Sequence, residues 1–201
     1  MKEVVLNNNN RLQVLQQALD IINSGGVIVY PTETSYGLGA DFYNKSAIDK
    51  VYNIKNRDKE HKLSVLVPDL DTARTIVNFP DEARRLAEIH WPGALTLILP
   101  FRNCNWPDHC SDYLALRVSD HTFANELVKS FGGPIIATSA NISGQDDCYG
   151  PEQVREQFKN QQQLDLFINA GYLAKNKPST IVKFTDQQAE ILRQGNLKIN
   201  I

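Results

Sequence analysis

Short apolar segments alternate with helical segments along most of the chain, and this alternation restricts the fold more than any other feature of the sequence. Apolar runs with the length of buried strands occupy residues 27–30, 63–67, 95–99, 114–118 and 135–138, and closing strands are expected at 167–168, 180–184 and 190–193. The segments between them have helical character. Because strands and helices mix throughout, the sequence predicts an α/β or α+β fold around a mixed β-sheet.

Local signals place the first elements. One face of a predicted helix carries four apolar residues, Leu12, Leu15, Leu19 and Ile22, and Gly25-Gly26 ends that helix. Asn44 is expected to cap a second helix, which leads to residue 55. The intervening residues 31–39 are rich in turn formers and are predicted to form a loop. We expect residues 8–201 to form one domain and residues 1–7 a short N-terminal extension.

Composition and charge are those of an ordinary globular chain, with 42% hydrophobic residues, 22% charged residues and a net charge of -2. No global basic signature indicates nucleic acid. Residues 45–62 hold six Lys/Arg against three acids, which is either an anion-binding patch or a solvated helix face. No apolar run approaches the roughly 20 residues that cross a bilayer, no signal sequence follows Met1, and three cysteines argue against a disulfide scaffold. We therefore expect a cytoplasmic protein without membrane contact.

Two pairs of polar residues suggest nucleotide chemistry. Lys55 and Arg57 are two residues apart, so in an extended chain both cations would point to one side and suit a polyphosphate. Ser139 and Asn141 follow the apolar run 135–138, where an α/β protein usually binds its ligand. The chain lacks a Walker sequence, and Gly37-Leu38-Gly39 lacks the third glycine of a dinucleotide fingerprint. A nucleotide must therefore bind by another architecture.

Arg117 interrupts an apolar strand and needs a partner, because an unpaired buried charge is costly. One interpretation is an ion pair with an acidic residue such as Asp112 or Asp120. The other is a clamp on a carboxylate or phosphate, for which the arginine fork is well suited. Residue type alone leaves both interpretations open.

No metal site is predicted. Cys104, His109 and Cys110 hint at one, but their spacing matches no common zinc pattern. A polar loop is the favoured interpretation of that segment.

Taken together, seven stretches in order resemble the YrdC-like family, specifically its short-form threonylcarbamoyl-AMP synthases (the TsaC type). The stretches are residues 29–39, 55–57, 91–93, 116–118, 139–144, 178–180 and 192–195. The K-x-R and S-x-N signatures of the family are both intact. The chain departs from many relatives at Arg57-Asp58, where they carry Arg-Pro. The resemblance implies a single α/β domain around a twisted mixed sheet with a positively lined cavity.

The resemblance also implies a reaction. L-threonine, bicarbonate and ATP would give L-threonylcarbamoyl-AMP, pyrophosphate and water, the first step of threonylcarbamoyladenosine (t6A) formation in tRNA. Mg²⁺ would arrive with ATP, with no dedicated metal site and no tightly bound cofactor. Other proteins of the t6A pathway would transfer the product to the adenosine beside the anticodon, with or without direct tRNA contact by this chain.

Site residues follow from the family positions. Lys55, Arg57, Ser139 and Asn141 would be catalytic and bind ATP. Ser179 and Arg193 would also line the nucleotide side, and Thr34 and Arg117 would bind threonine.

Two alternatives remain. A non-catalytic YrdC-like protein would bind RNA or nucleotide without needing threonine. A carbamoyl-adenylate-forming domain, like that of the hydrogenase-maturation carbamoyltransferases, would be expected inside a larger protein.

Overall fold

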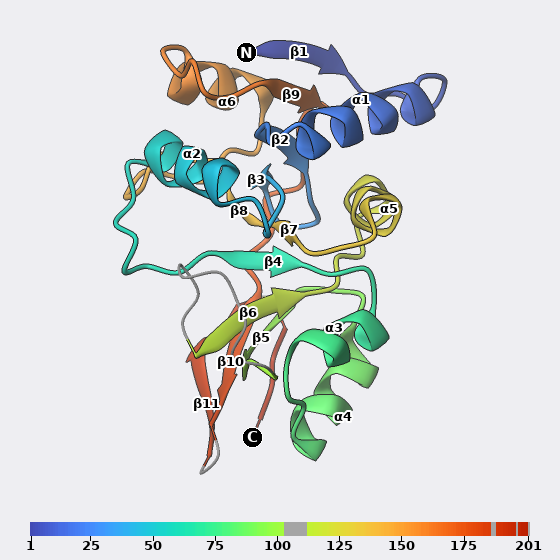
Figure 1. The fold of residues 1–201 in the computed structure, drawn as a ribbon, viewed down its shortest axis with the longest axis vertical. Helices are drawn as coiled ribbons and strands as arrows, with labels where there is room; N and C mark the ends of the chain where they lie inside the picture. The colour runs from blue at the N-terminus through green and yellow to red at the C-terminus, as the bar shows by residue number, and fades with distance from the viewer. Residues whose placement is uncertain (103–111, 186–187, 196, 201) are drawn as a thin grey trace.

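The computed structural model describes residues 1–102, 112–185, 188–195 and 197–200. In this part of the chain, two β-sheets lie one above the other with helices packed around them (Figure 1). The predicted mixed α/β architecture is confirmed, but the strands are divided between two sheets rather than gathered in one.

The upper sheet has five strands. In spatial order they are β1 (Lys2–Val5), β9 (Leu166–Asn169), β2 (Ile28–Pro31), β3 (Tyr36–Gly39) and β8 (Thr138–Ser139). The first three run parallel, and β3 is antiparallel to both of its neighbours.

Two local expectations change in this sheet. Residues 2–5, assigned to an extension, form β1 and pair with the edge of β9. The predicted loop 31–39 contains β3, because Tyr36 and Leu38 are fully buried and the Tyr36 ring packs edge-on against Phe167. Both strands depend on distant partners, which the local turn and strand signals do not encode.

The lower sheet has six strands. In spatial order they are β11 (Ala189–Arg193), β10 (Thr180–Phe184), β5 (Leu95–Pro100), β6 (Tyr113–Arg117), β4 (Ser64–Leu66) and β7 (Ile135–Ile136). Its central strands β5 and β6 come from the predicted apolar runs, and Leu95, Leu97, Leu99 and Leu116 are all buried. Parallel and antiparallel pairs alternate across it.

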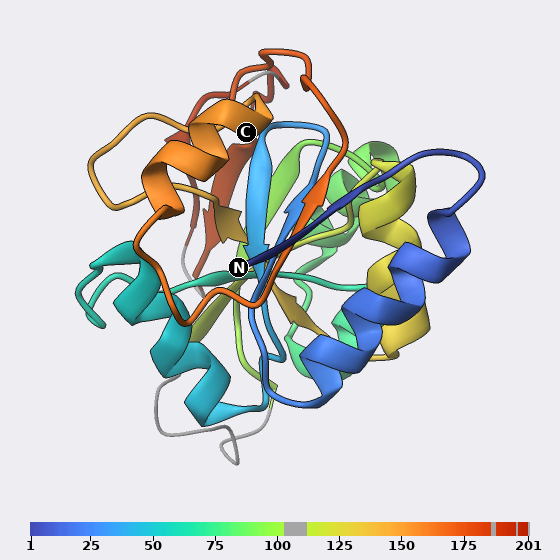
Figure 2. The same cartoon turned by 90° about the horizontal axis from the view of Figure 1, so that it is seen from above.

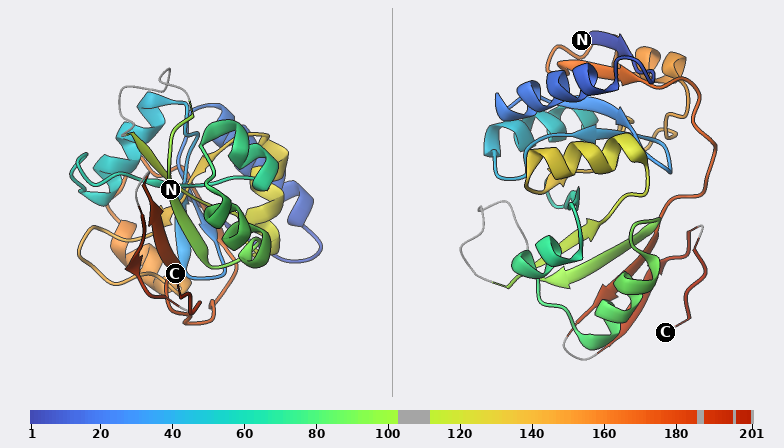
Figure 3. Two further views of the ribbon diagram at one scale, coloured as in Figure 1. Left: turned by 90° about the horizontal axis from the view of Figure 1, so that it is seen from below. Right: turned by 90° about the vertical axis from the view of Figure 1, so that its right-hand side faces the viewer.

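Besides the long connection from β3 to β4, the chain crosses between the sheets at two places. The single strand predicted at 135–138 is split: β7 pairs with β4 in the lower sheet, and β8 pairs with β3 in the upper one. Ala137 lies at the step and donates its N–H to Ser64 O at 2.8 Å. Residues 170–179 make the second crossing, from β9 down to β10 (Figure 3). Polar groups from both sheets therefore meet between them.

Helices flank both sheets. They are α1 (Arg11–Asn23), α2 (Lys45–Lys55), α3 (Leu70–Ile76), α4 (Asp81–His90), α5 (Thr122–Phe131) and α6 (Pro151–Phe158). Figure 2 shows α1 and α5 on one side of the upper strands and α2 and α6 on the other, whereas α3 and α4 lie beside the lower sheet in Figure 1. None of the helices in the described ranges is long and apolar enough to span a membrane.

The first two helices test the local signals. The predicted Asn44 cap is confirmed, since its side chain accepts the Ala47 N–H at 3.1 Å. The predicted buried face of α1 is only partly right. Leu12 is 78% exposed, whereas Val14 and Ala18 are buried against α5 and the sheet. Because α1 packs against α5, the buried face of α1 is rotated from the one that the leucine spacing predicted.

Candidate functional site

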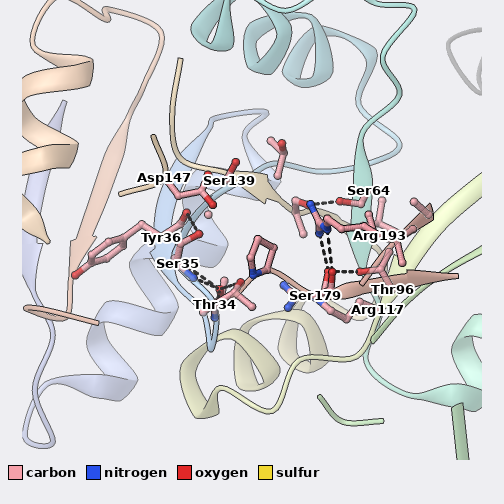
Figure 4. Close-up of a pocket in the computed structure, with 18 of the residues that line it drawn as sticks. Thr34, Ser35, Tyr36, Ser64, Thr96, Arg117, Ser139, Asp147, Ser179 and Arg193 are labelled. Atoms are coloured by element: carbon pink, nitrogen blue, oxygen red, sulfur yellow. Dashed lines mark hydrogen bonds between the residues drawn. The ribbon is translucent and has the colours of Figure 1, made fainter. Parts of the chain in front are cut away.

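A cavity of about 350 Å³ lies between the two sheets, within the usual size range of small-molecule sites. Thr34 and Ser139 line it from the upper sheet, and Thr96, Arg117 and Arg193 line it from the lower one (Figure 4). We call it the central cavity. It therefore brings together residues that are up to 163 positions apart in the chain, from Tyr30 to Arg193.

Cations outnumber acids among the described residues that line the central cavity. Its charged residues are Arg57, Lys62, Arg117, Arg193 and Asp147. Such a lining favours an anionic ligand, because fixed cations in a partly enclosed site attract negative charge more strongly than cations in water.

Lys55 is not where the sequence predicted it. It is the last residue of α2, and Asn56 follows in the left-handed conformation with φ 48°, so the chain is not extended there and the two cations do not share one face. Lys55 is 1% exposed and is absent from the described lining of the central cavity. A helix end in this position buries Lys55, whereas Arg57 is partly exposed and lines the central cavity.

The Lys55 ammonium is fully occupied. Its Nζ donates to Ser139 O at 2.6 Å, to Asn141 O at 2.9 Å and to Asn141 Oδ1 at 2.8 Å. An ammonium has three donors, and all three are used. Burial, with a smaller effect of the nearby Arg57 cation, lowers the pKa of Lys55 from 10.5 to about 8. We call Lys55, Ser139 and Asn141 the Lys55 cluster.

Asn141 joins the rest of that cluster. Its Oδ1 also accepts from Ser139 Oγ at 2.8 Å, and its Nδ2 donates to Gln145 O at 2.6 Å. The N–H of Ser143 donates a hydrogen bond to Lys55 O at 2.8 Å. Lys55 of the K-x-R signature is thus in contact with both polar residues of the S-x-N signature. Of the cluster, Ser139 faces the central cavity, while Asn141 is not among its described lining residues.

Arg57 reaches the central cavity from a different direction. Its Nε donates to His61 O at 3.0 Å and its Nη2 to Lys62 O at 3.3 Å. These bonds fold the segment 57–62 back on itself and hold the guanidinium at the cavity mouth. The basic segment 45–62 is therefore partly a wall of the site, and one of its lysines, Lys59, is paired with Asp49 on the surface.

Arg193, Ser179 and Thr96 form a second polar group, which we call the Arg193 cluster. Arg193 donates from Nε to Ser179 O at 3.0 Å and from Nη2 to Ser179 Oγ at 3.1 Å, and the Ser179 hydroxyl is 2.8 Å from Thr96 Oγ1. All three residues line the central cavity (Figure 4). Thr96 was not predicted, because nothing in an apolar strand distinguishes a threonine that faces a ligand.

Gly195 ends the Arg193-Gln194-Gly195 stretch and packs against the backbone at the start of β10. A Cβ on this residue would lie 2.0 Å from Pro178 O and 2.7 Å from Thr180 N. Only glycine lets the C-terminal segment approach the backbone of Ser179 so closely. The approach places Arg193 over Ser179.

Arg117 has an acidic partner, but it is neither Asp112 nor Asp120. Its Nη1 donates to Glu33 Oε1, and Ser119 Oγ donates to Glu33 Oε2. Arg117 and Glu33 side chains are only 10% and 13% exposed. Burial lowers the pKa of Arg117, and Asp120 acts against that shift. The ion-pair interpretation is confirmed, with a different partner. The ligand-clamp interpretation stays a prediction, and Arg117 does line the central cavity.

The loop between β2 and β3 presents Thr34 beside this ion pair. Thr32 Oγ1 accepts the N–H of Thr34 at 3.2 Å and donates to Ser35 O at 2.7 Å. Asn176, from the second crossing segment, donates to Glu33 O at 2.9 Å. The loop is therefore held from both sheets, with Thr34 facing the central cavity (Figure 4).

Other candidates lie apart from this site. Cys104, His109 and Cys110 fall outside the described residues. Within the described ranges, no three His, Cys, Asp or Glu side chains gather as a metal site. Cys148 is buried, and burial raises the pKa of its thiol to about 12. A thiol held protonated in this way is a poor nucleophile.

Comparison with known proteins identifies the family. The Sua5/YciO/YrdC family model, described as telomere recombination, matches residues 20–195. The chain belongs to this family. The predicted YrdC-like resemblance is therefore confirmed over most of the sequence.

Members of the family differ in what their names report. A Vibrio campbellii protein named threonylcarbamoyl-AMP synthase is 34% identical over 188 residues, which are 90% of this chain and 98% of the relative. P. abyssi Sua5 complexed with L-threonine has a TM-score of 0.86 and 29% identity, and covers 96% of this chain. E. coli YciO has a TM-score of 0.83 and 28% identity over 96% of this chain and 94% of its own. The match spans only 57% of the Sua5 chain.

Proposed function

We propose that this protein is a threonylcarbamoyl-AMP synthase. The observation that carries the proposal is that one cavity contains the family positions for both substrates. Arg117 and Thr34, expected on threonine, and Arg57, Ser179 and Arg193, expected on nucleotide, all line the central cavity. The family relationship and the name of the Vibrio campbellii relative support the same reaction.

The proposed chemistry needs no nucleophile from the protein. The amine of L-threonine and bicarbonate give a carbamate and water. A carbamate oxygen then forms a bond to the α-phosphorus of ATP, while the bond from that phosphorus to the β-phosphate oxygen breaks. Pyrophosphate leaves, and L-threonylcarbamoyl-AMP remains. In such a displacement the protein mainly positions the reactants and stabilises charge.

Each substrate would be held by residues from both sheets. Arg193, Ser179 and Arg57 would bind the phosphates and the developing charge, and the Ser139 hydroxyl would contact the adenylate side. Arg117 and Thr34 would hold threonine at the other end of the central cavity. Mg²⁺ would enter with ATP, and Asp147 is the described carboxylate in the lining that its hydration shell could meet.

The structure of the Lys55 cluster changes the role that the resemblance implied for two residues. Because all three donors of Lys55 are used internally, we propose that Lys55 and Asn141 shape the wall that carries Ser139, and that they contact ATP less directly than the resemblance implied.

The wider context of the proposal follows from the reaction. The product would pass to other t6A-pathway proteins that transfer the threonylcarbamoyl group to tRNA, and a cytoplasmic location is part of the proposal. Direct tRNA contact by the surface of residues 45–62 is a further element of the proposal, to be tested by the salt dependence of binding.

Pyrophosphate release from ATP tests the function, with threonine and bicarbonate each added or omitted. We expect release only when both are present, together with a nucleotide product whose mass equals that of threonylcarbamoyl-AMP. Release that ignores threonine, or no release from folded protein, would refute the proposal.

A second candidate is nucleotide or RNA binding without adenylation. The observation that favours it is again the occupied Lys55 ammonium, which removes one expected cation from the phosphates. Such a protein would bind ATP or RNA without any dependence on threonine and would release no pyrophosphate.

A further inference from the structure

The hydroxyl of Tyr30 is an unusual buried group. Tyr30 is 0% exposed, and its Oη has neither water access nor a hydrogen-bond partner within the described structure. A buried hydroxyl without a partner destabilises a fold, since it has lost its hydrogen bonds to water and gained none in return. Phenylalanine would fill the same space without that loss.

The fold makes specific room for this ring. Tyr30 lies in β2 opposite Gly37 of β3, and Gly37 in turn lies opposite Ser139 of β8. A Cβ on Gly39 would be 2.8 Å from Tyr30 Cε1, and a Cβ on Gly37 would be 3.5 Å from it. The Gly37-Leu38-Gly39 sequence, which does not form a dinucleotide fingerprint, therefore accommodates the ring of Tyr30.

Two observations indicate that Tyr30 and Arg117 face the same cavity. Tyr30 belongs to the same buried cluster as Leu66, and Leu66 is the direct cross-strand neighbour of Arg117. Directly opposed residues point to the same face of a sheet. Tyr30 is also among the residues that line the central cavity, as is Arg117.

The state of the phenol is also defined. Burial raises the pKa of Tyr30, and the Arg117 cation acts in the opposite direction but does not overcome burial. The phenol therefore stays protonated at physiological pH and acts as a hydrogen-bond donor. Within the described residues the free protein provides it with no acceptor, and because Oη is covered, a ligand reaches it only if the cavity wall shifts.

We propose that the Tyr30 hydroxyl donates a hydrogen bond to the carboxylate of the amino-acid substrate held by Arg117. A carboxylate supplies several acceptor lone pairs, and its charge draws it to the guanidinium. Glu33 occupies Arg117 Nη1, so the ligand must use the remaining edge of the fork together with other nearby donors. Tyr30 is such a donor. This inference rests on the proposed function, because it takes threonine as the ligand of Arg117.

The variant Tyr30→Phe tests the inference with two measurements. The Tm should rise, whereas the affinity for threonine should fall. In the free protein, removal of an unpaired buried hydroxyl should raise the Tm by about 2–4 °C. Tyr36→Phe is the matched control, because the Tyr36 hydroxyl donates to Gly171 O at 2.7 Å and accepts from Ala170 N at 2.9 Å. Its Tm should fall. A fall for Tyr30→Phe as well would show that its hydroxyl has a partner, and would overturn the inference.

Ligand binding is measured by calorimetric titration, which requires no turnover. We expect Tyr30→Phe to bind L-threonine about tenfold more weakly than the wild type. 1-Amino-2-propanol keeps the amine and the hydroxyl of threonine but has neither a carboxylate nor a carbonyl oxygen, so the variant should bind it as the wild type does. The wild-type preference for threonine over 1-amino-2-propanol should therefore narrow about tenfold.

Three results would overturn the inference: unchanged threonine affinity, equal losses for threonine and 1-amino-2-propanol, or a loss confined to ATP. The last would assign the hydroxyl to a phosphate. Pyrophosphate release by the wild type is measured separately. Failure of the proposed reaction is therefore distinct from failure of the Tyr30 contact.

Discussion

The Lys55 cluster and the Arg193 cluster lie on opposite sides of one cavity and use their polar groups differently. In the Lys55 cluster, each ammonium donor meets an oxygen of Ser139 or Asn141, and Lys55 is 1% exposed. In the Arg193 cluster, Arg193, Ser179 and Thr96 also bond to one another, yet all three line the central cavity. The polar groups of the Lys55 cluster are therefore bonded to one another within the cavity wall, whereas the Arg193 cluster forms part of the cavity surface.

The comparison shows that residues of one sequence signature can have different physical tasks. Lys55 joins the end of α2 to the segment that follows β8. Its partner Asn141 is 86 positions further along the chain. Its bonds set where the Ser139 hydroxyl points. Arg193 is available to a ligand, because its approach to Ser179 leaves the cluster open to the cavity. We therefore expect changes at Lys55 to affect stability first, and changes at Arg193 to affect catalysis first.

The largest effect is expected from Lys55→Met. Methionine fills much of the same volume, but it leaves two carbonyl oxygens and the Asn141 amide oxygen without this donor. Loss of charge-assisted bonds to buried acceptors should lower the free energy of unfolding by about 3 kcal/mol. Urea denaturation measures this loss.

Lys59→Met is the matched control for that variant. Lys59 pairs with Asp49, but its side chain is 63% exposed. An exposed pair contributes under about 1 kcal/mol, so the control should unfold nearly as the wild type does. A stable Lys55→Met protein with weakened ATP binding would instead indicate that Lys55 contacts the phosphates. The two clusters would then have the same role.

The next effect is expected from Arg193→Gln. If its guanidinium stabilises charge on the phosphates, pyrophosphate release should fall about 100-fold, as for loss of a single charge-stabilising donor in other enzymes. Stability should change by less than about 1 kcal/mol, because Arg193 itself is exposed at the cavity edge. Steady-state kinetics and urea denaturation on the same preparation separate the two quantities.

Arg85→Gln provides the reference for a surface arginine. Arg85 is an exposed residue of α4, away from the described lining of the central cavity. Both its turnover and its stability should match the wild type. If Arg193→Gln were destabilised as strongly as Lys55→Met, the two clusters would share one structural role.

The sequence predicted much of the fold because its signals are local. The apolar runs at 95–99 and 114–118 became β5 and β6, and Asn44 caps α2 through a residue three positions away. The same reasoning could not predict the division into two sheets. That division depends on Ala137, where a single apolar run changes its pairing partner from β4 to β3.

The site was predicted less completely for the same reason. Arg117 was recognised as a buried cation, but its partner Glu33 is 84 positions away and lies in what seemed a simple turn. The direction of Lys55 depended on whether α2 ended before or at that residue, which spacing alone does not decide. Tyr30 gave no signal at all, because an unsatisfied hydroxyl can be recognised only once its neighbours are known.

The smallest effect is expected from pH, and it sharpens the account of Lys55. Burial and Arg57 lower its pKa from 10.5 to about 8, while the three oxygen acceptors favour the protonated form. If burial dominates, the unfolded state binds more protons than the folded state above pH 8, so stability rises with pH between about 8 and 10.5. The difference in free energy of unfolding between the wild type and Lys55→Met should then grow by about 1 kcal/mol from pH 7 to pH 9. Urea denaturation across this range, with Lys59→Met alongside, measures it. A difference that shrinks would mean that the hydrogen bonds hold the proton more strongly than burial expels it, and that the closed cluster is stabilised by its charge.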